Sequence, residues 1–185
     1  MLPTASASFT AVEIGMRFTK LHDEVYVTDT DITKVSARDI DFLKKAAAGN
    51  SRRRARLCAH RDNADLLHEM LIVLAGDIYV RPHKHRGKSE SFHIVEGRLK
   101  VFVFDDDGGL VETIQMGEPG SGETFFYRLS REIYHSVHPE TEYVVFHEVT
   151  DGPFDRKDAV FAPWAPAEDG DPEEQKRFVQ GLLKR

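Results

Sequence analysis

Side chains of metal-binding types lie close together in one stretch of the sequence. His83 and His85 are two residues apart, so on a β-strand both imidazoles would point to the same face. Glu90 follows after a short loop and can return toward the same point from the next strand. Imidazole nitrogens and a carboxylate oxygen suit Mn, Fe, Co, Ni, Cu or Zn. We therefore predict a site for one divalent transition-metal ion.

A fourth ligand is expected from a distant part of the chain. His135 stands at the start of a predicted strand, IYHSV, after a glycine-rich loop. If the sheet closes on itself, this strand can face the first histidine pair. Three histidines and Glu90 would leave about two positions of an octahedron open for water or substrate.

These residues have to be positioned by a predominantly β architecture. Short apolar or alternating segments separated by Gly and Asp turns predict an all-β barrel or sandwich. A DDDGG loop at 105–109 marks a hairpin, since Asp and Gly tolerate positive φ. The expected strands are 9–18, 25–28, 66–74, 78–80, 92–95, 99–104, 111–116, 123–127, 136–137 and 143–149.

Helices are expected only toward the two ends. Residues 36–48 predict a helix that begins at the N-cap Ser36, carries Asp39 in its first turn and stops at Gly49. Residues 151–172 contain four prolines with aromatic residues between them, which predicts an extended segment packed on the body. A final helix is expected to open at Pro172.

Length and composition favour one domain with short additions. We expect an N-terminal extension over 1–35, a barrel with its leading helix over 36–150, and a tail with a helix over 151–185. A net charge of −6 does not favour nucleic acid, and no apolar run approaches the length of a membrane span. The single cysteine, Cys58, excludes an internal disulfide and is read as a small buried residue. With no secretory signal evident, a cytoplasmic protein is expected.

The metal-binding stretch resembles the first motif of the cupin superfamily, in which glycine precedes His-x-His, Glu and a final Gly. Four residues separate His85 from Glu90, and six separate Glu90 from Gly97. The second cupin motif, Pro-x-Gly-x-x-His, is matched at His135, whereas Ser130 and Glu132 stand in place of its proline and glycine. The resemblance implies a single cupin barrel (a jelly-roll-like double-stranded β-helix) with His83, His85, Glu90 and His135 as ligands.

Three further stretches resemble the WbuC family of cupin-fold metalloproteins. They are the entry RRRARLCAH, the segment from HEMLIVLAGDIYVRPHKH to FVFDDDG, and the tail GPFDRKDAVFAPWAPAEDGDP. Together they cover most of residues 36–172. The family is associated with bacterial surface-polysaccharide gene clusters, so the resemblance implies a sugar-related small-molecule ligand but no defined reaction.

Five other residues are candidates for binding a substrate. Arg52 and Arg54 belong to a basic run that could hold a carboxylate or phosphate, or could be a solvated loop. His68 could line the pocket mouth or be a satisfied core histidine. Tyr79 and Arg81 share strand parity with His83, so they point into the barrel unless the strand bulges before Pro82.

The sequence leaves three functions open. The first is a metal-dependent enzyme acting on a sugar or a polysaccharide precursor, with Zn, Fe, Mn or Ni as the ion. The second is a non-catalytic cupin that binds a saccharide or metabolite. The third is a metal-free sugar-nucleotide isomerase that uses His/Tyr acid–base chemistry. Exposed sheet edges and the aromatic tail suggest a homodimer in each case.

Overall fold

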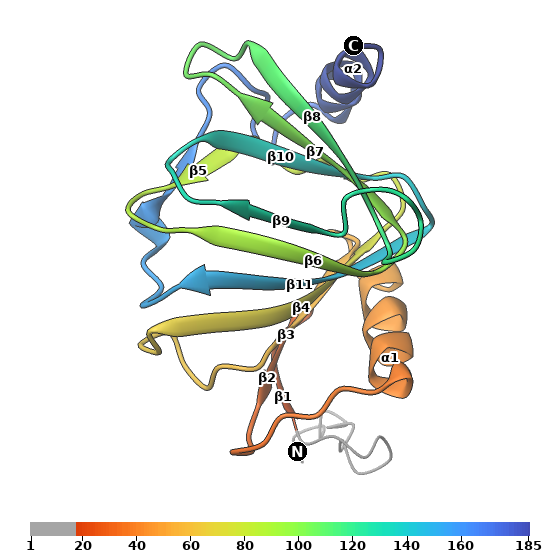
Figure 1. Cartoon of the computed structure of the whole chain (residues 1–185), viewed down its shortest axis with the longest axis vertical. Helices are drawn as coiled ribbons and strands as arrows, with labels where there is room; N and C mark the ends of the chain where they lie inside the picture. Colours follow the sequence, from red (N-terminus) through yellow and green to blue (C-terminus); the bar gives the residue numbers. More distant parts are fainter. Residues whose placement is uncertain (1–17) are drawn as a thin grey trace, which may run out of the picture.

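The computed structural model describes residues 18–185 as strands arranged in two facing layers, with helices on the outside (Figure 1). The strand expected over 9–18 lies outside the described residues except for Phe18, which begins β1. The elements are β1 (Phe18–His22), β2 (Val25–Thr28), α1 (Ala37–Ala48), β3 (Arg54–Cys58), β4 (Leu67–Ala75), β5 (His83–His85), β6 (Glu90–Glu96), β7 (Arg98–Phe104), β8 (Leu110–Gly117), β9 (Phe126–Leu129), β10 (Tyr134–Pro139), β11 (Tyr143–Asp151), the 3-10 turn η2 (Arg156–Asp158), β12 (Ala159–Phe161) and α2 (Pro172–Leu183).

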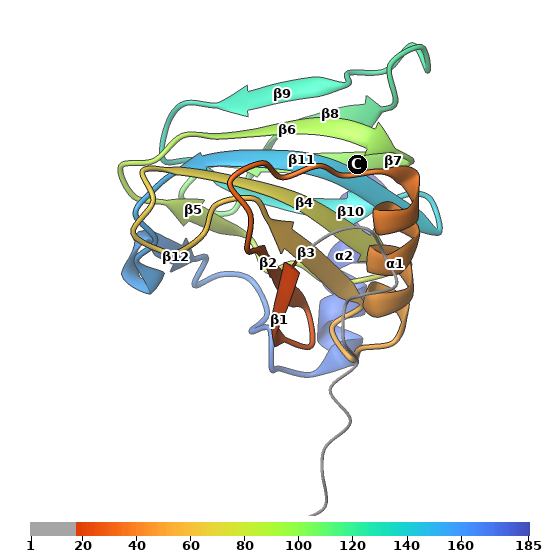
Figure 2. The same cartoon turned by 90° about the horizontal axis from the view of Figure 1, so that it is seen from below.

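The strands form two sheets that enclose one apolar core. One sheet has the order β1-β2-β3-β4-β11-β6-β9, and the other has the order β12-β5-β10-β7-β8. Figure 2 shows the two layers from below, with α1 beside one end of the barrel. Side chains of both sheets alternate between the inside and the outside, as the two-residue period of a strand requires. Ile72, Phe92, Val101, Met116 and Phe146 belong to the core between the sheets.

The outer face of the seven-stranded sheet is covered by α1. Its backbone begins after Ser36, whose N–H donates to the Asp39 carboxylate at 2.7 Å, and ends at Gly49. Leu43 and Ala47 are buried against Val73 and other outward-facing residues of β3, β4 and β11. The helix predicted over 36–48 is therefore present, and it closes one side of the barrel.

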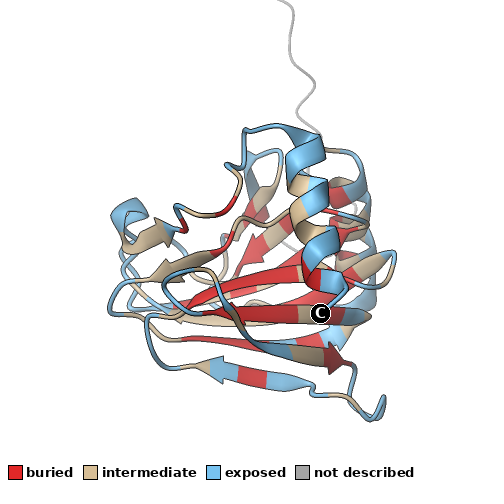
Figure 3. Ribbon diagram, turned by 90° about the horizontal axis from the view of Figure 1, so that it is seen from above, coloured by how far each residue is buried: buried red, intermediate tan, exposed pale blue. Residues whose placement is uncertain are grey.

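The C-terminal tail covers the other sheet. Strand β12 pairs antiparallel with β5, so the tail adds an edge strand directly beside the two histidines. Trp164 packs 5.0 Å from Phe104 between ring centroids, and its indole N–H donates to the carbonyl of Asp106. Helix α2 then begins at the N-cap Asp171 and packs Leu182 into the same cluster. In Figure 3 the buried residues follow the strands, whereas the outward faces of the helices are exposed.

Two predicted strands are wrong in position. Residues 78–80 form no strand, because the chain leaves the sheet after Gly76, which has a φ of +70°. Pro82, which has no N–H to donate, precedes β5, and β5 contains only three residues. The strand predicted over 123–127 begins later, at Phe126, because Glu123 lies in a bend and Thr124 makes only an isolated bridge with Met116.

Candidate metal centre

Neighbouring strands of one sheet place three histidines at the same point on the inner face. His135 in β10 is the register partner of His83 in β5, so their imidazoles project side by side. His85 lies two residues beyond His83 and projects to the same face. The three rings offer nitrogens that all lie within 4.8 Å of one another. Because His135 lies 52 positions after His83 and 50 after His85, only the closed barrel brings the group together.

Glu90 reaches the cluster from the opposite sheet. It begins β6, whose neighbours are β11 and β9, and its side chain crosses the barrel toward the histidines. Its carboxylate oxygens lie 3.0 Å from His135 Nε2 and 3.4 Å from His85 Nε2. Glu90 is 4% exposed and His135 is 1% exposed, so the contact is shielded from water. The four predicted ligands are therefore adjacent in space.

Backbone carbonyls determine which imidazole nitrogens face the centre. Nδ1 of His83 lies 2.9 Å from the carbonyl of Arg81, and Nδ1 of His135 lies 3.1 Å from the carbonyl of Ile133. A carbonyl oxygen can only accept, so each Nδ1 must carry the proton. In the neutral rings Nε2 then offers a lone pair, which is the usual arrangement for a histidine that binds a metal. For His83 this leaves the Nε2 lone pair facing the centre. His135 Nε2 lies 3.0 Å from the Glu90 carboxylate and shares a proton with it in the metal-free barrel, and a bound metal ion would displace that proton.

The electrostatics of the cluster favour a bound cation. Burial, followed by repulsion from His135 and His85, lowers the pKa of His83 to about 3, so this ring is neutral at neutral pH. Burial disfavours the charged forms of Glu90 and His135, but their mutual attraction outweighs it. The pKa of Glu90 is held below its ordinary value and that of His135 above it. The carboxylate remains ionised, and in the metal-free barrel the His135 imidazolium is its positive partner, a role that a metal cation could take over.

Sequence reasoning missed a second carboxyl group in the interior. Glu148 in β11 is the register partner of both Met70 and Phe92, whose side chains belong to the core. Burial, and next the charge of Glu90, raise the pKa of Glu148 to about 8. The available signal was strand parity, since Glu148 lies two residues after the apolar, inward-facing Phe146 and therefore on the same face.

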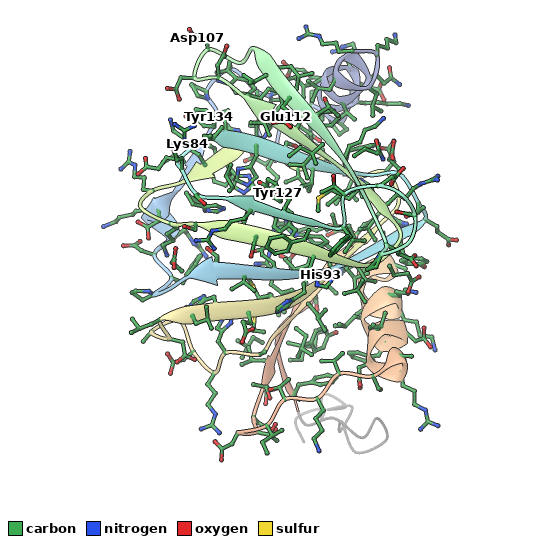
Figure 4. The ribbon with its side chains drawn as sticks, in the orientation of Figure 1. Lys84, His93, Asp107, Glu112, Tyr127 and Tyr134 are labelled. Atoms are coloured by element: carbon green, nitrogen blue, oxygen red, sulfur yellow. The ribbon has the colours of Figure 1, made fainter. Side chains whose placement is uncertain are left out.

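Tyr127 adds a further interior group that was not singled out from the sequence. Its ring packs 5.4 Å from Phe92, and burial raises the pKa of its hydroxyl. Within residues 18–185 this hydroxyl has no hydrogen-bond partner. By contrast, His93 on β6 is exposed on the outer side, in agreement with its predicted place outside the metal cluster. Both residues are labelled in Figure 4.

Arg52 and Arg54 are engaged with two carboxylates that the sequence did not link to them. Arg54 Nε lies 2.5 Å from Glu24, and Arg52 Nη1 lies 2.8 Å from the same side chain. Both arginines also pair with Glu168 of the tail. The two basic and two acidic groups form one network of equal and opposite charges, which connects the β1–β2 turn, the start of β3 and the tail. This network provides a structural role for both arginines.

The other three candidates have different surroundings. His68 is buried and stacks on His60 at 3.9 Å, on the inner face two strands away from Glu90. Tyr79 faces the tail, where its hydroxyl donates to the carbonyl of Pro166, because residues 78–80 are not in a strand. Arg81 donates from Nη2 to the carbonyl of Ala162 and lies over the ring of Phe161.

Comparisons with known proteins identify the fold. Residues 35–116 match a family described only as a domain of unknown function (DUF6016). No curated protein is significantly similar to this chain in sequence. The solved structure of SO0799 from Shewanella oneidensis is similar over 65% of this chain and 82% of that one, with 14% identity and a TM-score of 0.52. Also similar are TT1209 from Thermus thermophilus (56% and 87%, 16% identity, TM-score 0.44) and the Cnp3 cupin domain from Schizosaccharomyces pombe (55% and 66%, 14% identity, TM-score 0.43).

The two facing sheets form a single barrel of cupin-like, jelly-roll architecture, similar to that of SO0799. The predicted fold class is confirmed, including the short leading helix and the C-terminal extended tail with its helix. At sequence identities of 14–16%, structural similarity is evidence for the fold but not for a shared function. Among residues 18–185, no helix is long and apolar enough to cross a membrane.

Proposed function

We propose that this cupin protein binds one divalent transition-metal ion through His83, His85, Glu90 and His135. The observation that carries the proposal is a group of three histidines whose ring nitrogens lie within 4.8 Å of one another, with the buried Glu90 carboxylate against two of them. The carbonyls that hold Nδ1 of His83 and His135 orient the rings for this purpose. Nitrogen and oxygen donors of this kind accept Zn, Fe, Mn or Ni.

The ion would supply Lewis-acid chemistry to a small molecule in the barrel mouth. The residues of this chain prepare the site for that role. The pKa of Glu90 is held below its ordinary value by its histidine neighbours, and in the metal-free barrel burial and the charge of Glu90 raise the pKa of Glu148 to about 8. The rings of Phe92 and Phe146 pack on each other in the core between the sheets, and each lies two residues along its strand from one of these carboxyl groups.

The finer parts of the proposal rest on the resemblance to the WbuC family. They are a sugar or polysaccharide-precursor ligand, a cytoplasmic location and a homodimer. The non-catalytic binding cupin is the second candidate, and the two differ in coordination, since a catalytic site keeps an open position for substrate. The metal-free isomerase is the third candidate and predicts a purified protein with no bound metal.

The proposal is tested by measuring the metal content of the purified protein with inductively coupled plasma mass spectrometry. The wild type should carry about one ion per chain, and the His83→Ala, His85→Ala double variant should carry almost none. His93→Ala is the matched control, because His93 is an exposed histidine on the outer side of β6. Full metal content in the double variant, with the folded state confirmed by circular dichroism, would show that the ligand assignment is wrong.

A further inference from the structure

We propose that the cavity beside this metal centre binds a small hydroxylated carboxylic acid, such as a sugar acid, with its carboxylate on Arg81. The inference rests on the proposed function in one respect, namely that the cavity serves the metal site. It adds the substrate class and assigns the residues that would recognise it.

The cavity lies where the tail passes the edge of the five-stranded sheet. Its volume is about 420 Å³, within the range of small-molecule sites, and its lining comprises Arg52, Arg81, Phe161, Glu168 and Asp169. Phe161 in β12 is the register partner of His83 in β5, and the two rings are 6.0 Å apart. One wall of the cavity is therefore in contact with a proposed metal ligand.

Arg81 supplies the positive charge that the cavity offers to a ligand. The charges of Arg52 and Glu168 are already matched within the network that includes Glu24 and Arg54. None of the ion pairs in residues 18–185 includes Arg81, although its guanidinium is fixed by the carbonyl of Ala162 and by the Phe161 ring. Its Nε is buried with no hydrogen-bond partner in this part of the chain. A fixed guanidinium without an acidic partner is suited to binding a planar carboxylate.

The remaining lining selects the rest of the ligand. The ring of Phe161 is 47% exposed and provides an apolar surface next to the guanidinium. Asp169 is exposed at the cavity and takes part in no ion pair of the described residues, so its carboxylate can accept hydrogen bonds from hydroxyl groups. A phosphate would use Arg81 but not the ring, and a neutral sugar would leave Arg81 unpaired. A hydroxylated acid satisfies all three groups.

The inference is tested by isothermal titration of the metal-containing protein with three probes, namely glucuronate, glucose and inorganic phosphate. Glucuronate should bind at least about tenfold more tightly than either of the others, because only it combines a carboxylate with hydroxyl groups. Equal affinity for glucose would overturn the role of Arg81. Tighter binding of phosphate would overturn the assigned ligand class.

Variants separate this inference from the proposed metal site. Arg81→Met should weaken glucuronate binding by about tenfold or more while the metal content stays that of the wild type. The same substitution on the outer face, Arg128→Met, should change neither quantity. Asp169→Asn, at an exposed position that does not threaten folding, should weaken glucuronate binding several-fold without affecting phosphate. Undiminished glucuronate binding in the Arg81 or the Asp169 variant would overturn the inference. A purified wild-type protein without bound metal would instead contradict the proposed function.

Discussion

Replacement of Gly97 by alanine should destabilise the barrel by about 3 kcal/mol. Gly97 joins β6 to β7 with a φ of +84°, a conformation that costs an L-residue about 1–2 kcal/mol. A Cβ at this position would also overlap the carbonyl oxygen of Tyr143 and lie 2.5 Å from Thr141 Oγ1. The neighbouring Val144 is fully buried, so β11 cannot move away freely, and an overlap of this kind adds about 1–3 kcal/mol.

Gly122→Ala is the matched control for this measurement. Gly122 has a φ of +86°, but no atom lies within 4 Å of an added Cβ, so only the backbone cost of about 1 kcal/mol is expected. Urea unfolding followed by circular dichroism gives the free energy of unfolding of each variant. If the two variants agreed to within about 0.5 kcal/mol, the close approach of β11 to this turn would be refuted.

Three further predictions follow from the same structure. Burial raises the pKa of the Cys58 thiol to about 11, so the thiol stays protonated at pH 8. Iodoacetamide should therefore label Cys58 only after unfolding, and rapid labelling of the folded protein would contradict this. Trp164→Ala removes the ring contact with Phe104 and should lower the free energy of unfolding by about 3 kcal/mol. The tail should then be cleaved faster by a protease, and unchanged protease resistance would argue against the packing of Trp164 on the barrel. A suitable ion at a hundredfold excess over its Kd should stabilise the wild type by about 2.7 kcal/mol, seen as a higher Tm, and an equal rise in His135→Ala would count against its role as a ligand.

The parts of the site that depend on local order could be predicted from the sequence. Strand parity puts His83 and His85 on one face. The short spacing from His85 to Glu90 and Gly97 indicates that the next strand runs back toward the histidines. His135 required the resemblance to a known motif, because its approach to His83 depends on the closure of the barrel. Such closure is a property of the whole sheet and leaves no local pattern.

Long-range partners were not predictable for the same reason. Arg52 pairs with Glu168 from a point 116 residues away, so a basic run that resembles an anion site is largely neutralised by the tail. Tyr79 was placed by strand parity, but the chain leaves the sheet after Gly76 and parity no longer applies. Glu148 was overlooked because a carboxyl group at an inward position of an apolar strand resembles an ordinary alternating residue.

The central claim is tested most directly by a crystal structure of the purified protein with anomalous data collected at the edge of its metal. The account predicts one ion bonded to Nε2 of His83, His85 and His135 and to Glu90, with bond lengths of about 2.0–2.3 Å. Anomalous density elsewhere in the molecule, or coordination through the Nδ1 atoms that face the carbonyls of Arg81 and Ile133, would contradict it.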